Sequence, residues 1–190
     1  MECVPTTRLT VRPAVQGDAD DIGNVHAAAW LAAYDDIFEP EFLKGAAQGR
    51  RIGYRQLLPE LLAAPKIFLV AVRDGTLVGF VHATPQTSEP ALSEILGFYL
   101  HPDVWGSGVA DTLMAQTLQS LAVDTEDVVL WTLRDAARAR RFYEKAGFQA
   151  TGRQRSETLT DWSSATSVER PAVEYARTLA PQRAMLGSEH

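Results

Sequence analysis

One glycine-rich loop stands out in this chain, at Val104-Trp105-Gly106-Ser107-Gly108-Val109-Ala110. An apolar, strand-like run precedes it at residues 94–100, and residues 109–123 follow with a helical stripe of apolar side chains. Glycines let the main chain approach a ligand closely, and the start of a helix offers unpaired N–H groups and the positive end of its dipole. The loop therefore indicates either a cradle for a pyrophosphate or a tight strand-to-helix turn without a ligand.

Two common phosphate-binding motifs do not fit this loop. A P-loop requires Gly-x-x-x-x-Gly-Lys-Ser/Thr, whereas Leu113 and Met114 follow here. A dinucleotide-binding loop requires Gly-x-Gly-x-x-Gly/Ala, and Asp111 occupies the last of these positions. The acid expected at the end of the next strand is also missing, because Asp127 begins that strand. Both classes are therefore rejected.

Hydrophobic periodicity and turn residues divide the rest of the chain into strands and helices. Asp74-Gly75 between two apolar runs is the two-residue turn of a β-hairpin, and Asp18 is expected to cap the first helix. Strands are expected at residues 7–13, 66–73, 76–85, 94–100, 127–133, 148–153 and 168–178. Helices are expected at residues 18–34, 109–123 and 136–146, with helical pieces at 41–64 broken at Gly45, Gly49, Gly53 and Pro59. This order predicts a mixed α/β sheet in which antiparallel strands lead into a βαβ unit.

Composition narrows the class of protein. The length of 190 residues suits one domain, expected at residues 1–180, with a frayed polar tail at 181–190. The net charge of −6 disfavours nucleic acid as a partner. The single cysteine, Cys3, permits neither an internal disulfide nor a thiol metal site. No apolar run approaches the roughly 18 residues of a membrane span, and no signal peptide is evident. We therefore expect a cytoplasmic protein with no membrane partner.

Two segments resemble the GNAT superfamily of N-acyltransferases. Phe98-Tyr99-Leu100-His101-Pro102-Asp103, continuing into residues 105–110, is similar to the family's acyl-CoA loop, Gln/Arg-x-x-Gly-x-Gly/Ala. Ala139-Arg140-Arg141-Phe142-Tyr143-Glu144-Lys145-Ala146-Gly147-Phe148 is similar to its late helix and following strand. A weaker likeness begins at Val11-Arg12-Pro13-Ala14, so the resemblance spans roughly residues 8–179. It implies a GNAT-like fold, a mostly antiparallel sheet flanked by helices, with a splayed parallel strand pair forming an acyl-CoA cleft.

The resemblance implies acetyl-CoA as the co-substrate. Exposed main-chain N–H groups on the splayed strand would bind the acyl carbonyl and the pantetheine arm. The implied coenzyme contacts are Tyr99, Leu100, Trp105, Gly106, Ser107, Gly108, Val109, Ala110, Asp111 and Ala136. Two of these depart from the family's pattern. Trp105 replaces the usual Arg or Gln, and Ala136 replaces an Asn that helps to hold the pantetheine arm or the local backbone.

Acetyl transfer to an amine is helped by a base, because the amine must lose a proton to become a nucleophile. An alkyl amine has a pKa of about 10.4, so neutralising it at pH 7 costs roughly 4 to 5 kcal/mol. Glu94 lies on the strand that leads to the implied acyl site, where the family often places a carboxylate; the alternative is a solvated strand-end charge. By resemblance, Tyr143 lies beside the leaving sulfur and can protonate it; the alternative is a core aromatic side chain. A thioester is already activated, so no metal is expected.

Other side chains carry weaker indications. Trp30 and Tyr34, near the apolar stripe of the first helix, are the first choices for acceptor contacts by resemblance, although they also suit a core. His82 and His101 are expected to be structural. Arg134, Arg138, Arg140 and Arg141 form either a solvated helix face or a contact to the coenzyme's adenosine phosphate. Cys3 is too terminal for an acyl-cysteine intermediate, which favours direct transfer in a ternary complex.

These observations together predict an N-acetyltransferase acting on a primary amine of a small molecule or a peptide. The alternatives are an acyl-CoA-binding regulatory module without turnover, suggested by Trp105 and Ala136, and a plain interaction protein on the same fold. An acidic chain attracts cationic acceptors. The resemblance also allows a homodimer.

Overall fold

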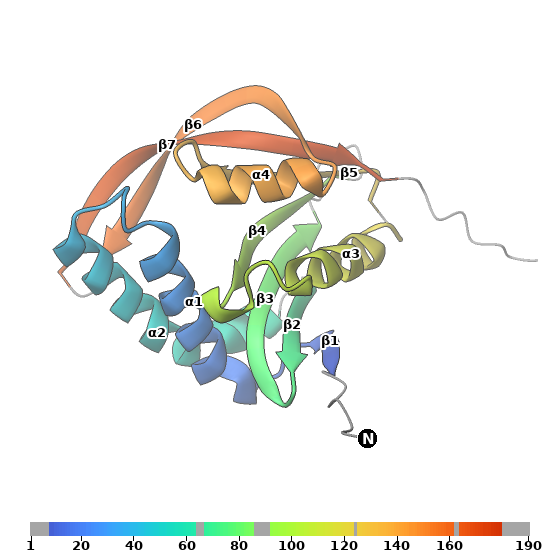
Figure 1. The fold of residues 1–190 in the computed structure, drawn as a ribbon, viewed down its shortest axis with the longest axis horizontal. Coiled ribbons are helices and arrows are strands. Elements are labelled where there is room, and N and C mark those ends of the chain that lie inside the picture. Colours follow the sequence, from blue (N-terminus) through green and yellow to red (C-terminus); the bar gives the residue numbers. More distant parts are fainter. Residues whose placement is uncertain (1–7, 64–66, 86–91, 124, 162–163, 180–190) are drawn as a thin grey trace, which may run out of the picture.

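A single seven-stranded sheet, ordered β1-β2-β3-β4-β5-β7-β6, runs through the molecule. The computed structural model describes residues 8–63, 67–85, 92–123, 125–161 and 164–179 (Figure 1). The strands are β1 (Leu9–Pro13), β2 (Ile67–Arg73), β3 (Thr76–Pro85), β4 (Leu92–Leu100), β5 (Asp127–Leu133), β6 (Gln149–Asp161) and β7 (Thr166–Thr178). The α-helices are α1 (Ala19–Ala33), α2 (Pro40–Ala63), α3 (Val109–Leu121) and α4 (Ala137–Lys145), and two short 3₁₀ helices lie at Gln16–Asp18 and Pro102–Val104. Cys3 and the expected tail lie outside the described residues.

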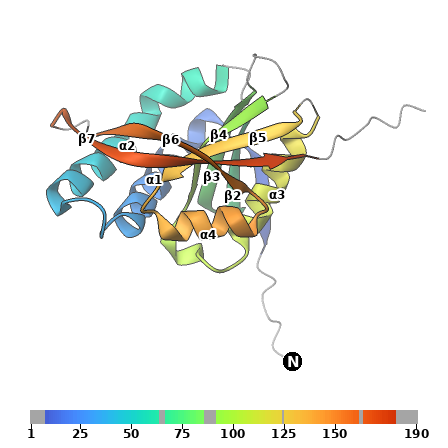
Figure 2. The same cartoon turned by 90° about the horizontal axis from the view of Figure 1, so that it is seen from above.

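Helices cover both faces of the sheet. Ile22 and Val25 of α1 pack with Phe80 of β3 on one face. Leu113 of α3 and Tyr143 of α4 share the second cluster, on the other face. The two clusters separate because successive side chains of a strand point to opposite faces. Figures 1 and 2 show the resulting layers, with α1 and α2 together and α3 and α4 away from them.

All neighbouring strands are antiparallel except β4 and β5, which run parallel. The Asp74-Gly75 turn joins β2 to β3, and both residues have the positive φ that this hairpin turn requires (51° and 85°). These findings confirm the predicted mixed α/β sheet. In the described part of the chain, no helix combines the length and the apolar character needed to cross a bilayer.

Two regions differ most from the sequence expectation. The region expected as broken helical pieces is one helix, α2, which contains its glycines and Pro59. A Cβ on Gly45 would meet the Asp161 carboxylate at 2.1 Å, so this glycine permits close packing of α2 on β6. The last two strands also extend beyond the expected residues 148–153 and 168–178, because they form one long hairpin. Tertiary packing overrides the local breaking tendency in both cases.

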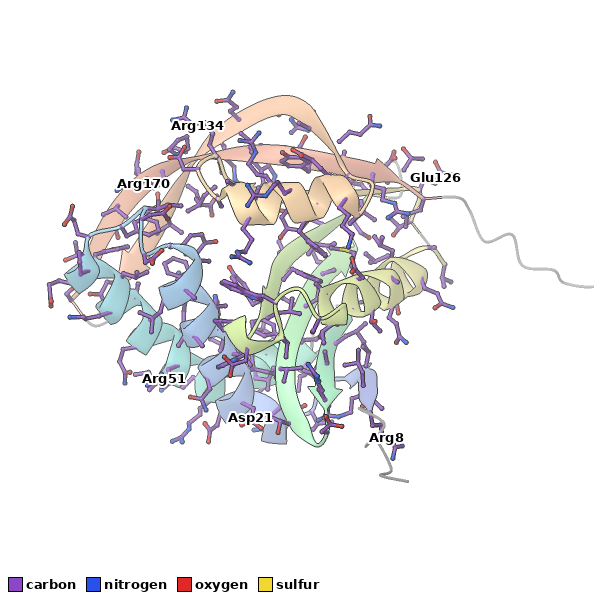
Figure 3. All side chains as sticks on the ribbon, in the orientation of Figure 1. Arg8, Asp21, Arg51, Glu126, Arg134 and Arg170 are labelled. Atoms are coloured by element: carbon purple, nitrogen blue, oxygen red, sulfur yellow. The ribbon has the colours of Figure 1, made fainter. Side chains whose placement is uncertain are left out.

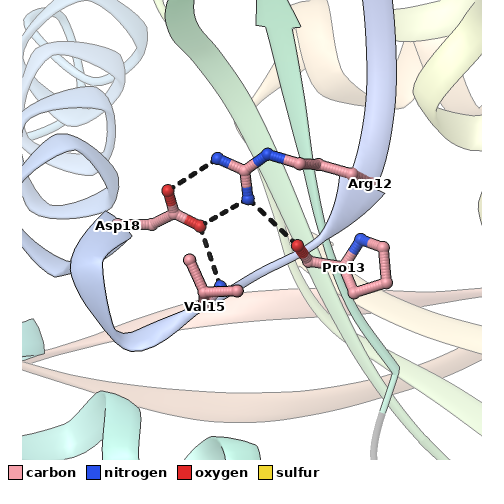
Figure 4. A network of polar contacts seen from close by, with 4 residues as sticks. All are labelled: Arg12, Pro13, Val15 and Asp18. Carbon is pink, nitrogen blue, oxygen red and sulfur yellow. Dashed lines mark hydrogen bonds and ion pairs between the residues drawn. The ribbon is translucent and has the colours of Figure 1, made fainter.

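The start of α1 is held by a different contact from the expected cap. Asp18 makes no side-chain bond to an α1 amide. Its carboxylate accepts two hydrogen bonds of 2.8 Å from the Arg12 guanidinium and one of 2.8 Å from the Val15 N–H (Figure 4). These bonds lower the pKa of Asp18 and connect β1 to the beginning of α1.

Candidate active site

The candidate site begins where the two parallel strands separate. β4 and β5 pair only from Leu92↔Asp127 to Ile95↔Leu130, whereas β4 stays paired with β3 as far as Leu100. Beyond Ile95, the β5-facing edge of β4 therefore borders an opening instead of a strand. This is the splayed pair that the sequence analysis expected.

A β-bulge in β4 decides which side chains face each other at this opening. Gly97 pairs with His82 and Ile95 pairs with Ala83, so Leu96 is an extra residue. Glu94 and Tyr99 are five residues apart and would lie on opposite faces of a regular strand. With the bulge, both lie on the α1 side, opposite Thr84 and Phe80 of β3. The bulge was not predicted from the sequence.

The opening is part of a cleft of about 700 Å³. One end is lined by the glycine loop and α4, and the other by the end of α1 with strands β5 and β6. Ten predicted site residues line the cleft: Glu94, Tyr99, Leu100, Trp105, Gly106, Ala110, Ala136, Tyr143, Trp30 and Tyr34. The structure thus brings together the implied acid, base, coenzyme and acceptor residues.

Four other predicted coenzyme residues lie outside this lining: Ser107, Gly108, Val109 and Asp111. The Val109 side chain is buried in the core, and Asp111 forms a 3.0 Å ion pair with Lys145 that joins α3 to α4. A coenzyme role for these four would rest on main-chain groups and stays a prediction.

The glycine loop requires glycine for conformational reasons. Gly106 and Gly108 have φ of 76° and 85°, and a Cβ at either position would meet no atom within 4 Å. Space is therefore available beside the loop, but residues with a side chain are strained there. Gly108 is the residue before the first turn of α3. This geometry fits both expected readings of the loop, a phosphate cradle and a tight turn, so the cradle stays a prediction.

Trp105, the first departure from the family's pattern, links the loop to α4. Its indole N–H donates a 3.1 Å hydrogen bond to the Leu100 carbonyl, and the Arg138 guanidinium carbon lies 4.2 Å from the ring centroid. Arg138 and Arg141 both line the cleft, so the second of the two expected roles, a contact to the coenzyme, stays open for them. The Trp105 position thus still has a cation beside it, supplied by α4.

The other two arginines of that run have structural contacts. Arg140 donates to the Tyr175 hydroxyl at 3.0 Å and to the Arg134 carbonyl at 3.1 Å, and Tyr175 in turn donates to Glu144 at 2.7 Å. Arg134 lies 3.6 Å from Asp135 at the periphery of the molecule (Figure 3). Arg140 therefore fixes α4 on β7 and holds Tyr143 at the cleft.

Tyr143 is buried yet borders the cleft. Its ring packs against Phe142, Phe148 and Tyr175. Burial, with a smaller effect from Tyr99, raises the pKa of the Tyr143 phenol well above its usual value. The hydroxyl therefore stays protonated at physiological pH and has a proton to give, but its raised pKa makes it a weaker acid than a free phenol.

The far end of the cleft is rich in aromatic side chains. Trp30 is 2% exposed and packs edge-on against Tyr34 at 5.0 Å. Opposite, the Arg155 guanidinium lies 4.4 Å from the Trp131 ring centroid and 2.8 Å from the Glu157 carboxylate. The sequence analysis placed Trp131 in the expected strand at residues 127–133 without a site role, and it missed Arg155 and Glu157 because it ended the sixth strand at residue 153. The charges at every second position, Arg153, Arg155 and Glu157, are the strand signal that could have extended it.

Histidines support the site without lining it. The His26 ring lies 4.0 Å from that of Tyr99, and its Nδ1 lies 3.0 Å from the Tyr54 hydroxyl. Burial lowers the pKa of His26 well below its usual value, so the ring is neutral. His82 stacks on Phe68 at 5.5 Å, and His101 accepts a 3.3 Å hydrogen bond from the Asp103 N–H. These contacts agree with the structural roles expected for His82 and His101.

Comparison with known proteins gives a consistent result. The sequence model of the acetyltransferase (GNAT) family matches residues 28–148. A mycothiol acetyltransferase of Brachybacterium faecium is 36% identical over 132 residues, which cover 67% of this chain and 39% of that protein. A probable N-acetyltransferase of Mycobacterium tuberculosis is 24% identical over 170 residues, covering 89% of this chain and 93% of that protein. The chain thus spans well under half of the first of these relatives.

Solved structures share the fold. The PaiA N-acetyltransferase of Thermoplasma acidophilum, in complex with coenzyme A, gives a TM-score of 0.68 at 19% identity, over 88% of this chain and 98% of that one. A GCN5-related N-acetyltransferase of Rhodopseudomonas palustris gives 0.70 at 19% identity, over 90% and 95%. Together with the splayed strands and the glycine loop, the family match over more than half of the sequence shows that this chain belongs to the GNAT acetyltransferase family.

Proposed function

We propose that this protein transfers an acetyl group from acetyl-CoA to a primary amine of a small molecule or a peptide, by direct attack in a ternary complex. The observation that carries the proposal is the single cleft through the split between β4 and β5. It joins the glycine loop and Tyr143 at one end to Trp30 and Tyr34 at the other. Two substrates entering from these ends would meet beside Tyr99.

The coenzyme would occupy the end formed by the glycine loop and α4. Main-chain N–H groups at the start of α3 favour an anionic diphosphate, and Arg138 and Arg141 add positive charge at the same end. A guanidinium stacked on an indole keeps its in-plane N–H donors available, so Arg138 can bind phosphate while it contacts Trp105. The edge of β4 beyond Ile95 would receive the pantetheine arm.

The reaction then needs two proton movements. The amine nitrogen attacks the thioester carbonyl, the C–S bond breaks, and the thiolate takes a proton from the Tyr143 hydroxyl. The amine loses a proton to Glu94, directly or through water. Donors on the β4 edge stabilise the carbonyl oxygen as charge develops on it.

The test is thiol release from acetyl-CoA with a panel of amines, with mass spectrometry of the product. The panel contains diamines, peptide amines and the unacetylated precursor of mycothiol. The last is included because one relative is named mycothiol acetyltransferase. Thiol release that depends on an amine and yields an acetylated amine supports the proposal. Coenzyme binding without turnover on any amine would instead favour the regulatory module that Trp105 and Ala136 suggest.

A further inference from the structure

A buried arginine lies behind the proposed acceptor end of the cleft. Arg50 belongs to α2, is 8% exposed and is not one of the residues that line the cleft. Its Nη1 donates a 2.9 Å hydrogen bond to the Ala46 carbonyl, one turn earlier in the same helix. An arginine side chain stays protonated inside proteins. The layer that α1 and α2 form beside the sheet (Figure 1) therefore contains a buried positive charge.

The guanidinium of Arg50 packs on the ring of Trp30, which lines the cleft. The Arg50 Cζ lies 3.2 Å from the centroid of the Trp30 ring. A flat guanidinium stacks on an indole and is also attracted to its π electrons, most strongly where water is excluded. Trp30 is 2% exposed, so this contact is desolvated. The orientation of the Trp30 ring therefore depends on Arg50.

The opposite charge for Arg50 comes from Asp161 at the end of β6. Burial lowers the pKa of Arg50, and the Asp161 carboxylate acts in the other direction. Asp161 is buried and accepts a 2.6 Å hydrogen bond from the Ser164 hydroxyl. Gly45 makes room for this carboxylate, although a glycine inside a helix lowers its stability. Buried ion pairs are often no more stabilising than apolar side chains of similar size, so stability alone is a weak reason for this pair.

We propose that Arg50 is a positioning residue for the acceptor site, where it holds the Trp30 ring in the orientation that contacts the bound amine. Trp30 packs edge-on against Tyr34 at 5.0 Å, so a displaced indole would also disturb this second expected acceptor contact. The glycine loop and Tyr143 lie at the other end of the cleft, so coenzyme binding should not depend on Arg50. The effect on the amine rests on the proposed function, whereas the effect on the Trp30 ring does not.

Fluorine NMR of protein labelled with 5-fluorotryptophan tests the ring position without a substrate. The chain has four tryptophans, and Trp30→Phe and Trp105→Phe identify two of the resonances by their loss. In Arg50→Met, the Trp30 resonance should shift or split, whereas the Trp105 resonance should stay in place. Arg55→Met, an exposed change on the same helix, is the matched control and should move neither. If circular dichroism shows that Arg50→Met is unfolded, Arg50→Met/Asp161→Asn replaces it, because that variant leaves no buried charge without its partner.

Steady-state kinetics with an amine that the wild type acetylates test the consequence for the acceptor. In Arg50→Met, the KM for the amine should rise by about 5- to 30-fold with kcat almost unchanged, because a binding contact is lost and the reacting groups are not touched. The acetyl-CoA dissociation constant, measured by calorimetry, should stay the same.

The two measurements separate failure of this inference from failure of the proposed function. An unchanged Trp30 resonance, an unchanged KM for the amine, or a loss of acetyl-CoA affinity as large as the rise in that KM would each overturn the role of Arg50. If the wild type acetylates no amine, the proposed function fails, and the Trp30 resonance still decides whether Arg50 positions the ring.

Discussion

The Tyr143 side chain is buried and yet borders the open cleft. Its burial raises the pKa of the phenol, so the hydroxyl is protonated throughout the physiological range. A thiolate leaving group has a pKa of about 8.5, so it can be expelled without protonation, and the hydroxyl assists the step without being essential.

We therefore expect Tyr143→Phe to lower turnover by about 10- to 10⁴-fold, because only the donated proton is lost. The phenylalanine keeps the packing against Phe142 and Phe148, so the acetyl-CoA dissociation constant should stay unchanged. Steady-state thiol release and calorimetry measure the two effects. Unchanged turnover would remove Tyr143 from the mechanism.

Glu94 lies on the same face as Tyr99 because of the Leu96 bulge. If it accepts the amine proton, turnover falls at low pH when its carboxylate is protonated. Glu94→Gln should then lower kcat by about 10²- to 10⁴-fold and remove this acidic limb from the pH–rate profile. A variant whose acidic limb matches that of the wild type would exclude Glu94 as the base.

Arg138 offers a test of the coenzyme end. Arg138→Ala should weaken acetyl-CoA binding by about 10- to 100-fold, as expected for a lost charged hydrogen bond to phosphate. The dissociation constant of S-acetylpantetheine, an analogue of acetyl-CoA without phosphates, should not change. Arg134→Ala is the matched control, because Arg134 pairs with Asp135 and does not line the cleft. Equal losses with both ligands would show that Arg138 acts through packing and not through phosphate.

At the scale of elements, the site depends on how α1 and α4 are fixed to the sheet. Arg140, Tyr175 and Glu144 hold α4 on β7. The Arg12–Asp18 pair holds the beginning of α1 at β1, and the last turn of that helix carries Trp30. Both contacts lie away from the cleft, so changes there should affect stability before chemistry.

Asp18→Asn should lower the free energy of unfolding by about 1 to 2 kcal/mol at pH 7, because a charge-assisted pair is lost. The pKa of Asp18 is lowered in the folded state, so its carboxylate stabilises the fold above its unfolded pKa. This contribution disappears as the pH falls through the folded pKa, so the free energies of unfolding of the wild type and the variant should then become equal. Urea unfolding across acidic pH measures the difference. Asp20→Asn, which removes an exposed pair with Arg55, should behave like the wild type at every pH.

Turn and glycine signals in the sequence predicted the elements whose conformation depends on a few neighbouring residues. Asp74-Gly75 indicated its hairpin, and Gly106 and Gly108 indicated a strand-to-helix loop; both have the positive φ that glycine-rich turns adopt. The unbroken α2 and the length of β6 were not predictable in this way, because their continuity comes from packing between distant segments, such as Gly45 against Asp161. The Leu96 bulge likewise depends on the register with β3, which one strand's sequence does not contain.

At the scale of the whole molecule, the split between β4 and β5 gives the cleft two ends, from which two substrates could reach the same region beside Tyr99. The glycine loop and α4 form one end of the cleft, and the proposed acceptor end is lined by the end of α1 with β5 and β6. Both substrates can then be bound together, which is the arrangement that direct transfer needs. The sequence indicated the residues of the proposed coenzyme end, because that motif is contiguous. By resemblance it also gave Trp30 and Tyr34 for the proposed acceptor end. Arg155 and Glu157 reach the same cleft only through the long hairpin of β6 and β7, which local signals did not predict.

The most direct test of this account is a calorimetric titration of acetyl-CoA into the purified protein, with free CoA for comparison. The account predicts saturable one-site binding with a micromolar dissociation constant, which would show that Trp105 and Ala136 are compatible with a working coenzyme cleft. No binding up to millimolar acetyl-CoA would contradict it, because the cleft between β4 and β5 would then serve another ligand or none.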